Sequence, residues 1–436
     1  MAYHKFFLQP MKKLLVTPSI LRGNISIPPS KSHTLRAILF GMMGRGTSII
    51  VNYLHSPDTE AMISAIQQFQ ISVRRYSNYL MIKGNNGNIS IAEDIIDSGN
   101  SGLVFRLIGA IAGLSKGHTI ITGDYSVRNR RPIKPLLDGL QQLKVSAYSA
   151  RPSGGAPIIV KGPPVSGTIH VCGADSQPIS ALLIAASFIE GVTEIFVKNP
   201  GECPWIDMTL YWLKKLNIPY HRMGYHYYKI RGKNTYPGFH IKIPGDFSSA
   251  AYPLVAALIT GSEITLHNVD FSDIQGDKKV IAILQKMGAN LELTANSIHV
   301  KKTLELQGMD ISVNDCIDAI TILSVVGCFA KGTTRLLNGG IAKYKECNRI
   351  AAMTRELRKM GATIYETDEG MVIQSSTLQE TPNLYGHGDH RVILSLAVAA
   401  LGASGTSIIH EVDPIHKTYG SFVQDLQTLG ADLRIY

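Results

Sequence analysis

One segment pattern recurs six times along the 436 residues, and this repeat constrains the fold more than any other feature of the sequence. Each copy has an apolar run of small residues, a glycine, a short β-branched stretch and an amphipathic run. Successive glycines are 71, 74, 70, 71 and 73 residues apart, at Gly46, Gly117, Gly191, Gly261, Gly332 and Gly405. Such regular spacing argues against a chance similarity of amphipathic segments.

Each copy predicts alternating helices and strands. In the first copy, AILFGMM has helical character, RGTSIIVNY turns into a strand, and ISAIQQF again has helical spacing. The glycine at the join suits a helix C-cap. Units of about 70 residues are too long for a solenoid repeat, and the chain is long enough for two domains. The sequence therefore predicts an α/β fold with two domains of three units each.

The composition is that of a soluble globular protein, with 45% hydrophobic and 17% charged residues. No apolar stretch approaches the ~20 residues that a membrane span needs. Pro18 and Arg22 interrupt any apolar run near the N-terminus, which argues against a signal peptide. Met1 and Met11 are both candidates for the start of the chain. The five cysteines have no metal-ligand spacing and are odd in number, which favours reduced thiols and a cytoplasmic location.

The formal net charge of +10 favours an anionic ligand. A nucleic-acid surface would need a concentrated basic patch, whereas Lys and Arg are spread along this chain. We therefore expect small anionic substrates, no nucleic acid and no membrane partner.

The segment from Pro29 to Arg36, PSKSHTLR, brings two cations to a chain reversal where a helix is expected to begin. Lys31 and Arg36 would attract an anion together with the N-terminal amides of that helix, and Ser32 adds a hydroxyl donor. Taken alone, this motif is more often a solvated basic turn.

Two further motifs in the first half of the chain suit anion binding. The loop from Gly99 to Gly102 has glycines that let backbone amides approach a ligand closely. The stretch from Gly123 to Arg131 ends in a strip of arginines. Each signal is weak by itself, because glycine-rich turns are common.

The second half of the chain carries charged motifs that resemble surface ion pairs when taken singly. They are Asp318, the run Lys345-Glu346-Cys347-Asn348-Arg349, the run Asp389-His390-Arg391, and Lys417. Together with Lys31, Arg36 and Arg131 of the first half, Lys345, Arg349, Arg391 and Lys417 make seven cations available for a polyanionic ligand pair. Arginine forks bind carboxylate and phosphate in bidentate geometry. Their order and spacing, together with the repeats, favour a single site.

From about residue 16 to residue 436 the chain resembles the enolpyruvyl transferase family, and its motifs resemble the shikimate-pathway branch of that family. PSKSHTLR is similar to PxSKSxxxR, GNSG to GNAGT, and KECNR to KExDR. The resemblance implies two domains, 1–29 plus 241–436 and 30–240, each with three βαβαββ repeats around buried helices, an inside-out α/β barrel. It also implies an open cleft that closes over the substrates, with crossings near residues 20–30 and 236–245.

The resemblance further implies an activity. The expected reaction moves the enolpyruvyl group of phosphoenolpyruvate to the 5-hydroxyl of 3-phosphoshikimate by addition and elimination, and releases phosphate. No cofactor is expected, because phosphoenolpyruvate is a substrate, and a monomer is expected.

Roles of individual residues follow from the same resemblance. Lys31 is expected to contact both substrates, Ser32 and Arg36 to hold the shikimate carboxylate side, and Gly102 and Arg131 to bind phosphoenolpyruvate. Asp318 is the expected base for the acceptor hydroxyl. Lys31 and Glu346 are alternative donors of the proton to the methylene carbon, and Lys31 and Lys417 are alternative partners of the leaving phosphate. The other expected substrate-binding residues are Ser176, Gln177, Lys345, Arg349 and Arg391.

Several positions depart from the family pattern. Asp175 replaces the first Ser of SSQ, and Glu202 lies where a Ser usually helps to bind the shikimate phosphate. A carboxylate beside a phosphate is repulsive unless it is protonated or turned away. Trp205 replaces a Tyr, and Leu103 and Leu107 replace the Thr and Pro near the glycine loop. The two leucines predict abnormal inhibition by glyphosate, which occupies the phosphoenolpyruvate site in the family.

Three alternatives remain open at this point. The first is an enolpyruvyl transferase with a different, unphosphorylated acceptor. The second is a nucleic-acid end-processing protein, since RNA 3′-terminal phosphate cyclases have related repeats, but no adenylylation histidine motif is found. The third is a catalytically inactive binding protein, against which the retention of Lys31, Asp318, Glu346 and the arginines argues.

Overall fold

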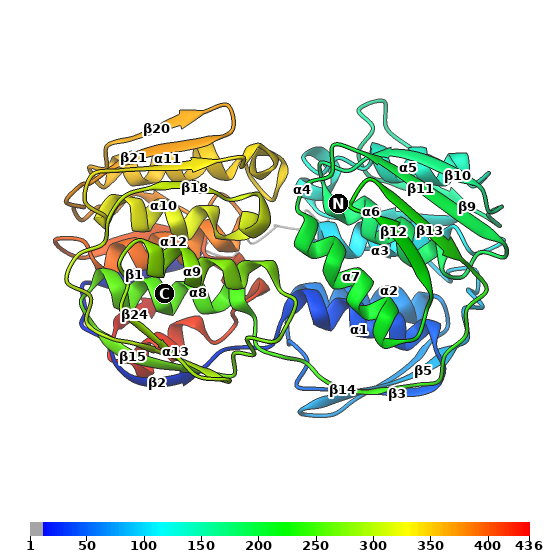
Figure 1. The fold of residues 1–436 in the computed structure, drawn as a ribbon, viewed down its shortest axis with the longest axis horizontal. Coiled ribbons are helices and arrows are strands. Elements are labelled where there is room, and N and C mark those ends of the chain that lie inside the picture. Colours follow the sequence, from blue (N-terminus) through cyan, green and yellow to red (C-terminus); the bar gives the residue numbers. More distant parts are fainter. Residues whose placement is uncertain (1–11) are drawn as a thin grey trace, which may run out of the picture.

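The computed structural model describes residues 12–436 and consists of two lobes that are joined by two chain crossings (Figure 1). Each lobe has its own hydrophobic core. The core of the first lobe includes Phe105 and Leu182, and that of the second lobe includes Leu323 and Leu396. The division into two cores follows from length, since a single core rarely serves a chain of this size.

Each lobe contains three four-stranded sheets, and all six sheets share one topology. In the sheet β6-β7-β9-β8, β6 runs parallel to β7, and each later neighbour is antiparallel. Helices connect the first three strands in the units of β6, β10, β18 and β22, whereas in the units of β3 and β15 the parallel edge strand, β14 or β2, comes from a distant part of the chain. The predicted α/β fold of six βαβαββ repeats, three per lobe, is confirmed.

The first lobe is built from three units. One unit contains α1 (Lys31–Met43), β3 (Arg45–Val51), α2 (Pro57–Gln68), β4 (Ser72–Arg75), β5 (Tyr79–Asn85) and β14 (His240–Lys242). The next contains β6 (Ile96–Asp97), α3 (Gly102–Ala112), β7 (Thr119–Thr122), α4 (Tyr125–Asn129), α5 (Lys134–Gln142), β8 (Ser146–Ser149) and β9 (Ile158–Lys161). The third contains β10 (Thr168–Cys172), α6 (Ser176–Ala186), β11 (Val192–Lys198), α7 (Cys203–Lys215), β12 (Tyr220–Met223) and β13 (Tyr227–Arg231).

The second lobe repeats this plan. Its first unit contains β2 (Arg22–Ser26), α8 (Phe247–Ile259), β15 (Glu263–His267), η1 (Gly276–Lys278), α9 (Lys279–Lys286), β16 (Leu291–Leu293) and β17 (Ser297–Val300). Its second contains β18 (Asp310–Ser312), η2 (Asn314–Ala319), α10 (Ile320–Phe329), β19 (Thr333–Leu337), η3 (Gly340–Tyr344), α11 (Arg349–Lys359), β20 (Ile364–Thr367) and β21 (Gly370–Gln374). Its third contains β22 (Leu384–Tyr385), α12 (His390–Leu401), β23 (Ser407–His410), η4 (Asp413–Lys417), α13 (Phe422–Thr428), β24 (Asp432–Ile435) and β1 (Lys13–Thr17).

The apolar runs seen in the sequence are the central helices of the lobes. Every residue of α3 and of α12 is buried, which requires helices that are apolar on all faces and rich in small side chains. The amphipathic runs form the outer helices, such as α5 and α11. Buried helices therefore begin at the inner edge of each lobe, where their first turns are available to a site.

The chain crosses between the lobes twice, and strands are exchanged around the crossings. β2 pairs with β15 of the second lobe, and β14 pairs with β3 of the first. Ile241 and Ile243 pack in the first core, immediately before the second crossing. At the crossings, the Ser30 amide donates to the Pro244 carbonyl over 2.8 Å.

The repeat glycines do not form helix C-caps as a class, contrary to the sequence prediction. Only Gly261 directly follows a C-cap residue, Thr260, and Gly46 lies inside β3. Gly46, Gly191, Gly261 and Gly332 all have positive φ, so the glycines serve the turn into the following strand.

No helix within residues 12–436 is long and apolar enough to cross a membrane. The choice between Met1 and Met11 as the start falls outside the described residues.

Candidate active site

A cavity lies between the two lobes, and it collects every site residue that the sequence predicted. The first lobe contributes Lys31, Ser32, Arg36, Gly102, Arg131, Ser176 and Gln177. The second lobe contributes Asp318, Lys345, Glu346, Arg349, Arg391 and Lys417. Their roles remain predictions, but segments up to several hundred residues apart meet in one place.

Five helices begin at this cavity. Lys31, Gly102, Ser176, Arg349 and His390 are the first residues of α1, α3, α6, α11 and α12, and all five line the cavity. A helix N-terminus carries partial positive charge and free N–H groups. The cavity is therefore suited to anions by its backbone as well as by its side chains.

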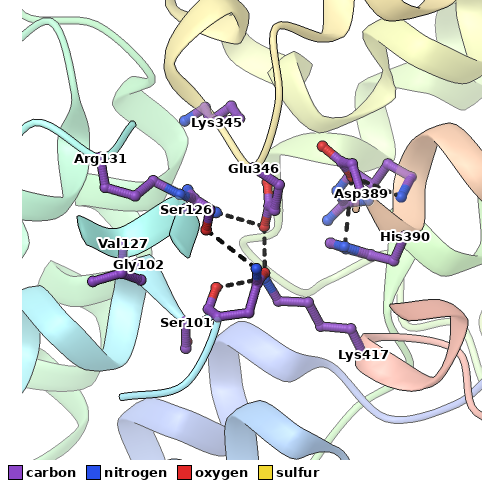
Figure 2. Close-up of polar contacts among 12 residues, drawn as sticks. Ser101, Gly102, Ser126, Val127, Arg131, Lys345, Glu346, Asp389, His390 and Lys417 are labelled. Atoms are coloured by element: carbon purple, nitrogen blue, oxygen red, sulfur yellow. Dashed lines mark hydrogen bonds and ion pairs between the residues drawn. The ribbon is translucent and has the colours of Figure 1, made fainter. Parts of the chain in front are cut away.

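Glu346 lies at the centre of a cluster of cations (Figure 2). Its Oε1 is 2.8 Å from Arg131 Nη2 and 2.7 Å from Lys417 Nζ, and its Oε2 accepts from Arg349 Nη2 over 2.7 Å. Burial acts to raise the pKa of Glu346, but Arg131, Lys417 and Arg349 outweigh it and hold that pKa well below the usual range. Glu346 is therefore ionised.

Asp318 is held between two arginines. Arg349 Nη1 donates to Oδ1 over 2.9 Å, and Arg391 Nη2 donates to Oδ2 over 2.7 Å. Burial acts to raise the pKa of Asp318, but Arg391 and Arg349 lower it far below its ordinary value. In this arrangement Asp318 is a weak base. It becomes a stronger base only if Arg349 or Arg391 stops donating to it.

Lys31 is fixed by contacts that the sequence did not predict. Its backbone amide donates to Asp246 Oδ2 over 3.1 Å, and its Nζ is 3.3 Å from Asp58 Oδ2. Asp58 also accepts from Ser101 Oγ over 2.9 Å. Burial lowers the pKa of Lys31, against the attraction of Asp58, and Lys417 lowers it further. Lys31 is thereby prepared to give up a proton more readily than an exposed lysine.

The lobes are closed on each other in this structure. Lys417 of the second lobe donates from Nζ to the Asn100 carbonyl over 2.9 Å and to Asn100 Oδ1 over 2.6 Å. The ion pair of Arg131 with Glu346 also joins the lobes. The sequence analysis expected an open cleft before binding, and that open arrangement remains a prediction.

Arg36 and Trp205 also line the cavity. Arg36 Nε donates to Thr209 Oγ1 over 3.0 Å, and its Nη2 donates to the Trp205 carbonyl over 3.2 Å. Burial lowers the pKa of Arg36 to about 10, so the guanidinium is still charged near neutral pH. Arg36 therefore provides a fixed positive charge in the cavity.

The two unexpected carboxylates have different surroundings. Asp175 Oδ2 is 2.9 Å from Arg106 Nη2, and the same guanidinium donates to Gln177 Oε1 over 2.9 Å. Glu202 accepts from Ser176 and forms an ion pair with Lys345 across the lobes. Asp175 is thus neutralised by a partner of its own, whereas Glu202 occupies donors that line the cavity.

Three residues near the reacting groups were missed by the sequence analysis as individual candidates. Asp58 and His390 line the cavity, and Asn100 binds Lys417. Asp58 follows Ser56-Pro57 at the start of α2, where an acidic residue is ordinary helix chemistry. His390 is buried, which lowers its pKa well below the ordinary value and keeps it neutral. Asn100 was visible in the glycine loop but carried no distinguishing signal.

Metal ligation has no candidate in the part of the chain that the structure describes. No group of three or more His, Cys, Asp or Glu side chains in residues 12–436 is placed to hold an ion. The carboxylates of the cavity are instead directed at lysines and arginines.

Comparison with known sequences gives a consistent family. The model of the EPSP synthase (3-phosphoshikimate 1-carboxyvinyltransferase) family matches residues 15–426. A 3-phosphoshikimate 1-carboxyvinyltransferase of Acetivibrio thermocellus is 40% identical over 420 residues, covering 96% of this chain and 99% of the relative. One of Chlamydia caviae is 40% identical over 424 residues, covering 97% and 94%.

Comparison with solved structures agrees on the fold. An EPSP synthase from Acinetobacter baumannii superposes with a TM-score of 0.81 and 24% sequence identity. The match covers 98% of this chain and 100% of that chain. The whole two-lobe arrangement is therefore shared, rather than one unit of it.

Proposed function

The chain belongs to the EPSP synthase family, and from this membership we infer that it transfers the enolpyruvyl group of phosphoenolpyruvate to the 5-hydroxyl of 3-phosphoshikimate, releasing phosphate. The reaction is a step of the shikimate pathway, which leads to chorismate and the aromatic amino acids. The observation that carries this function is the meeting of all predicted site residues in one cavity between the lobes. Nothing in the comparisons favours a different acceptor.

We propose that the cations around Glu346 form the phosphoenolpyruvate site. Arg131, Arg349 and Lys417 already converge on one carboxylate, and Gly102 begins a helix beside them. Phosphoenolpyruvate offers a carboxylate and a phosphate to the same donors, and charge-assisted bonds of this kind are strong in a water-excluded site.

We propose that substrate binding turns Asp318 into a competent base. An anionic substrate that takes Arg349 or Arg391 removes the main charges that depress the pKa of Asp318. The pKa of this buried carboxylate then rises, which brings it closer to what general-base catalysis requires. Asp318 would accept the proton of the acceptor hydroxyl as that oxygen attacks the donor.

Of the two proposed donors for the methylene carbon, Lys31 is favoured. The lowered pKa of Lys31 lets it give up a proton more readily, whereas Glu346 is paired with cations that hold its pKa well below the usual range. Lys417 is then left as the proposed partner of the departing phosphate, since it contacts Glu346 and Asn100 at the donor end.

We propose a monomer that acts in the cytoplasm. Both lobes that form the cavity come from one chain, so the site is complete without a second copy. The substrates are phosphorylated metabolites, and their charge keeps them in the compartment where they are made. We also propose that the two lobes are the domains, with the hinge at residues 27–30 and 243–246.

The function is tested by mixing the protein with phosphoenolpyruvate and 3-phosphoshikimate and measuring phosphate release. Unphosphorylated shikimate serves as the parallel acceptor. Turnover that requires the 3-phosphate is the expected result. Turnover with shikimate alone, or none with either acceptor, would contradict the proposed function.

Gly102→Ala is expected to raise the KM for phosphoenolpyruvate by roughly tenfold, a cost of about 1.4 kcal/mol. The added methyl would lie 2.9 Å from Arg106 Nη1 and 3.0 Å from Arg131 Nη1, so Arg131 must shift. Steady-state kinetics at saturating 3-phosphoshikimate measure this effect. Gly167→Ala is the matched control, because a methyl at Gly167 meets nothing within 4 Å. An unchanged KM would show that Gly102 does not position Arg131.

A further inference from the structure

Glu202 occupies a pocket that is built for an anion. Its Oε2 accepts from the Ser176 amide and from Ser176 Oγ, both over 3.1 Å, and its Oε1 forms an ion pair with Lys345 Nζ. The Ser176 amide is the first N–H of α6, an eleven-residue helix. A helix N-terminus, a hydroxyl and an ammonium group are the donors that proteins use for phosphate. In this structure the carboxylate of Glu202 binds these donors.

This pocket is continuous with the rest of the site. Glu202, Ser176 and Lys345 line the same cavity as Arg36 and Asp318. The acceptor carries a phosphate as well as a carboxylate, and the donors that Glu202 uses are of the kind that bind phosphate. A phosphate and an ionised Glu202 cannot share them without strong repulsion.

We propose that Glu202 is a specificity-determining residue that accepts a proton when the acceptor's phosphate binds, so that 3-phosphoshikimate binding is coupled to proton uptake. This inference rests on the proposed function. The protonated carboxyl group has an O–H, which donates to a phosphate oxygen instead of competing for the same donors. The ammonium of Lys345 and the amide of Ser176 then donate to the phosphate instead of to Glu202.

The backbone below Glu202 argues against the other outcome, in which the side chain swings out of the cavity. Glu202 is 2% exposed and has a positive φ of 49°. Its amide donates to Asn314 Oδ1 of the second lobe over 3.0 Å. A methyl at Gly201 would lie 2.8 Å from the Ala174 carbonyl oxygen, so the backbone next to Glu202 packs closely against Ala174. Protonation needs no movement of this loop, whereas displacement does.

The surrounding charges also select Glu202 rather than Asp175 as the proton acceptor. Burial raises the pKa of Glu202, against the attraction of Lys345, and the nearby charge of Asp175 raises it further. Burial acts in the same way on Asp175, but Arg106, followed by Lys345, outweighs it and lowers the pKa of Asp175. Neighbouring carboxyls whose pKa values are pushed apart divide the acid and base roles between them.

The expected pH dependence follows from linkage. A phosphate beside Glu202 raises its pKa above that in the free enzyme, so the complex binds a proton more tightly. Acceptor binding is then favoured at low pH, and it weakens as the pH rises through the pKa of Glu202 in the free enzyme towards that in the complex. In that window the affinity for 3-phosphoshikimate falls by up to about tenfold per pH unit, the limit for uptake of one proton.

The test is calorimetric titration with 3-phosphoshikimate in two buffers of different ionisation enthalpy, between about pH 5.5 and about pH 8.5, a range that lies above the ordinary glutamate pKa and brackets neutrality. The parent is compared with Glu202→Gln, which keeps the shape but cannot take up the proton. The ligand's own phosphate titration is common to both proteins and cancels in the difference. Glu190→Gln is the matched control, because Glu190 pairs with Lys233 on the surface.

We expect the parent to take up more protons than Glu202→Gln, approaching one per bound ligand. At the upper pH we also expect Glu202→Gln to bind 3-phosphoshikimate at least about tenfold more tightly than the parent does. At that pH the parent has lost about tenfold in affinity because it must take up a proton to bind. Glu202→Ser, which also removes the carboxylate, should behave in the same way if the Gln variant folds poorly. Equal proton uptake in parent and variants would overturn the inference, since it would mean that Glu202 stays ionised or moves away.

Failure of the proposed function would look different. If shikimate binds to both proteins and 3-phosphoshikimate binds to neither, the proposed acceptor is wrong and the inference falls with it. If phosphate release from 3-phosphoshikimate and phosphoenolpyruvate is normal but the proton uptake of the parent equals that of Glu202→Gln, the inference alone is wrong.

Discussion

Asp318→Asn is expected to lower kcat by roughly 10²- to 10⁴-fold, the range for loss of a general base, while the chain remains folded. Asn keeps the size of the side chain and can still accept from Arg349 or Arg391, but it cannot take a proton from the acceptor hydroxyl. Arg349 also retains its bonds to Glu346 and to Asp389. Arg391 is buried and loses the carboxylate that pairs with it, so the melting temperature should also fall, and the loss of the base is measured in turnover.

Single-turnover kinetics with both substrates measure this effect, together with thermal unfolding of the free protein. Asp310→Asn is the control, because Asp310 forms a comparable pair with Arg335 at 3.1 Å on the surface. A kcat within about threefold of the parent, well below the general-base range, would remove Asp318 from the mechanism.

Glu346→Gln is expected to destabilise the free protein by about 3–5 kcal/mol, the usual cost of leaving a buried charge unpaired. The substitution leaves Arg131, Arg349 and Lys417 close together without the carboxylate at their centre. Phosphoenolpyruvate supplies negative charge to the same cations, so it should restore more stability to the variant than it adds to the parent.

Urea unfolding with and without phosphoenolpyruvate measures both quantities. Glu305→Gln is the control, because Glu305 pairs with Lys331 in an exposed position where ion pairs contribute little. If phosphoenolpyruvate stabilises Glu346→Gln no more than the parent, these cations are not its binding site.

The six-fold repeat made the fold predictable from the sequence. Each copy carries its own helical and strand periodicity, so the units could be recognised without knowledge of their partners. The strand exchange was less accessible, because β14 joins β3 through a pairing of residues almost two hundred positions apart. The packing of Ile241 and Ile243 in the first core depends on the same long-range pairing.

The site was predictable where charge and motif coincide. Lys31, Arg131 and Arg391 carried both signals, and all line the cavity. Asp58 carried neither signal, because an acidic residue in the first turn of a helix is commonly found there to stabilise the helix N-terminus. The sequence placed Glu202 near the acceptor phosphate but could not tell which way it faces, because its partner Lys345 comes from the other lobe.

The pairing of β1 has a consequence for the order in which a growing chain can fold. β1 lies between β23 and β24, so this N-terminal strand cannot form its full pairing until residues 432–435 have been synthesised. β2 likewise waits for β15. The first lobe is complete once β14 has emerged, and it can fold while the remainder is still being synthesised. The second lobe can close only after β24 has been made, which leaves β1 and β2 as unpaired edges until their partner strands emerge.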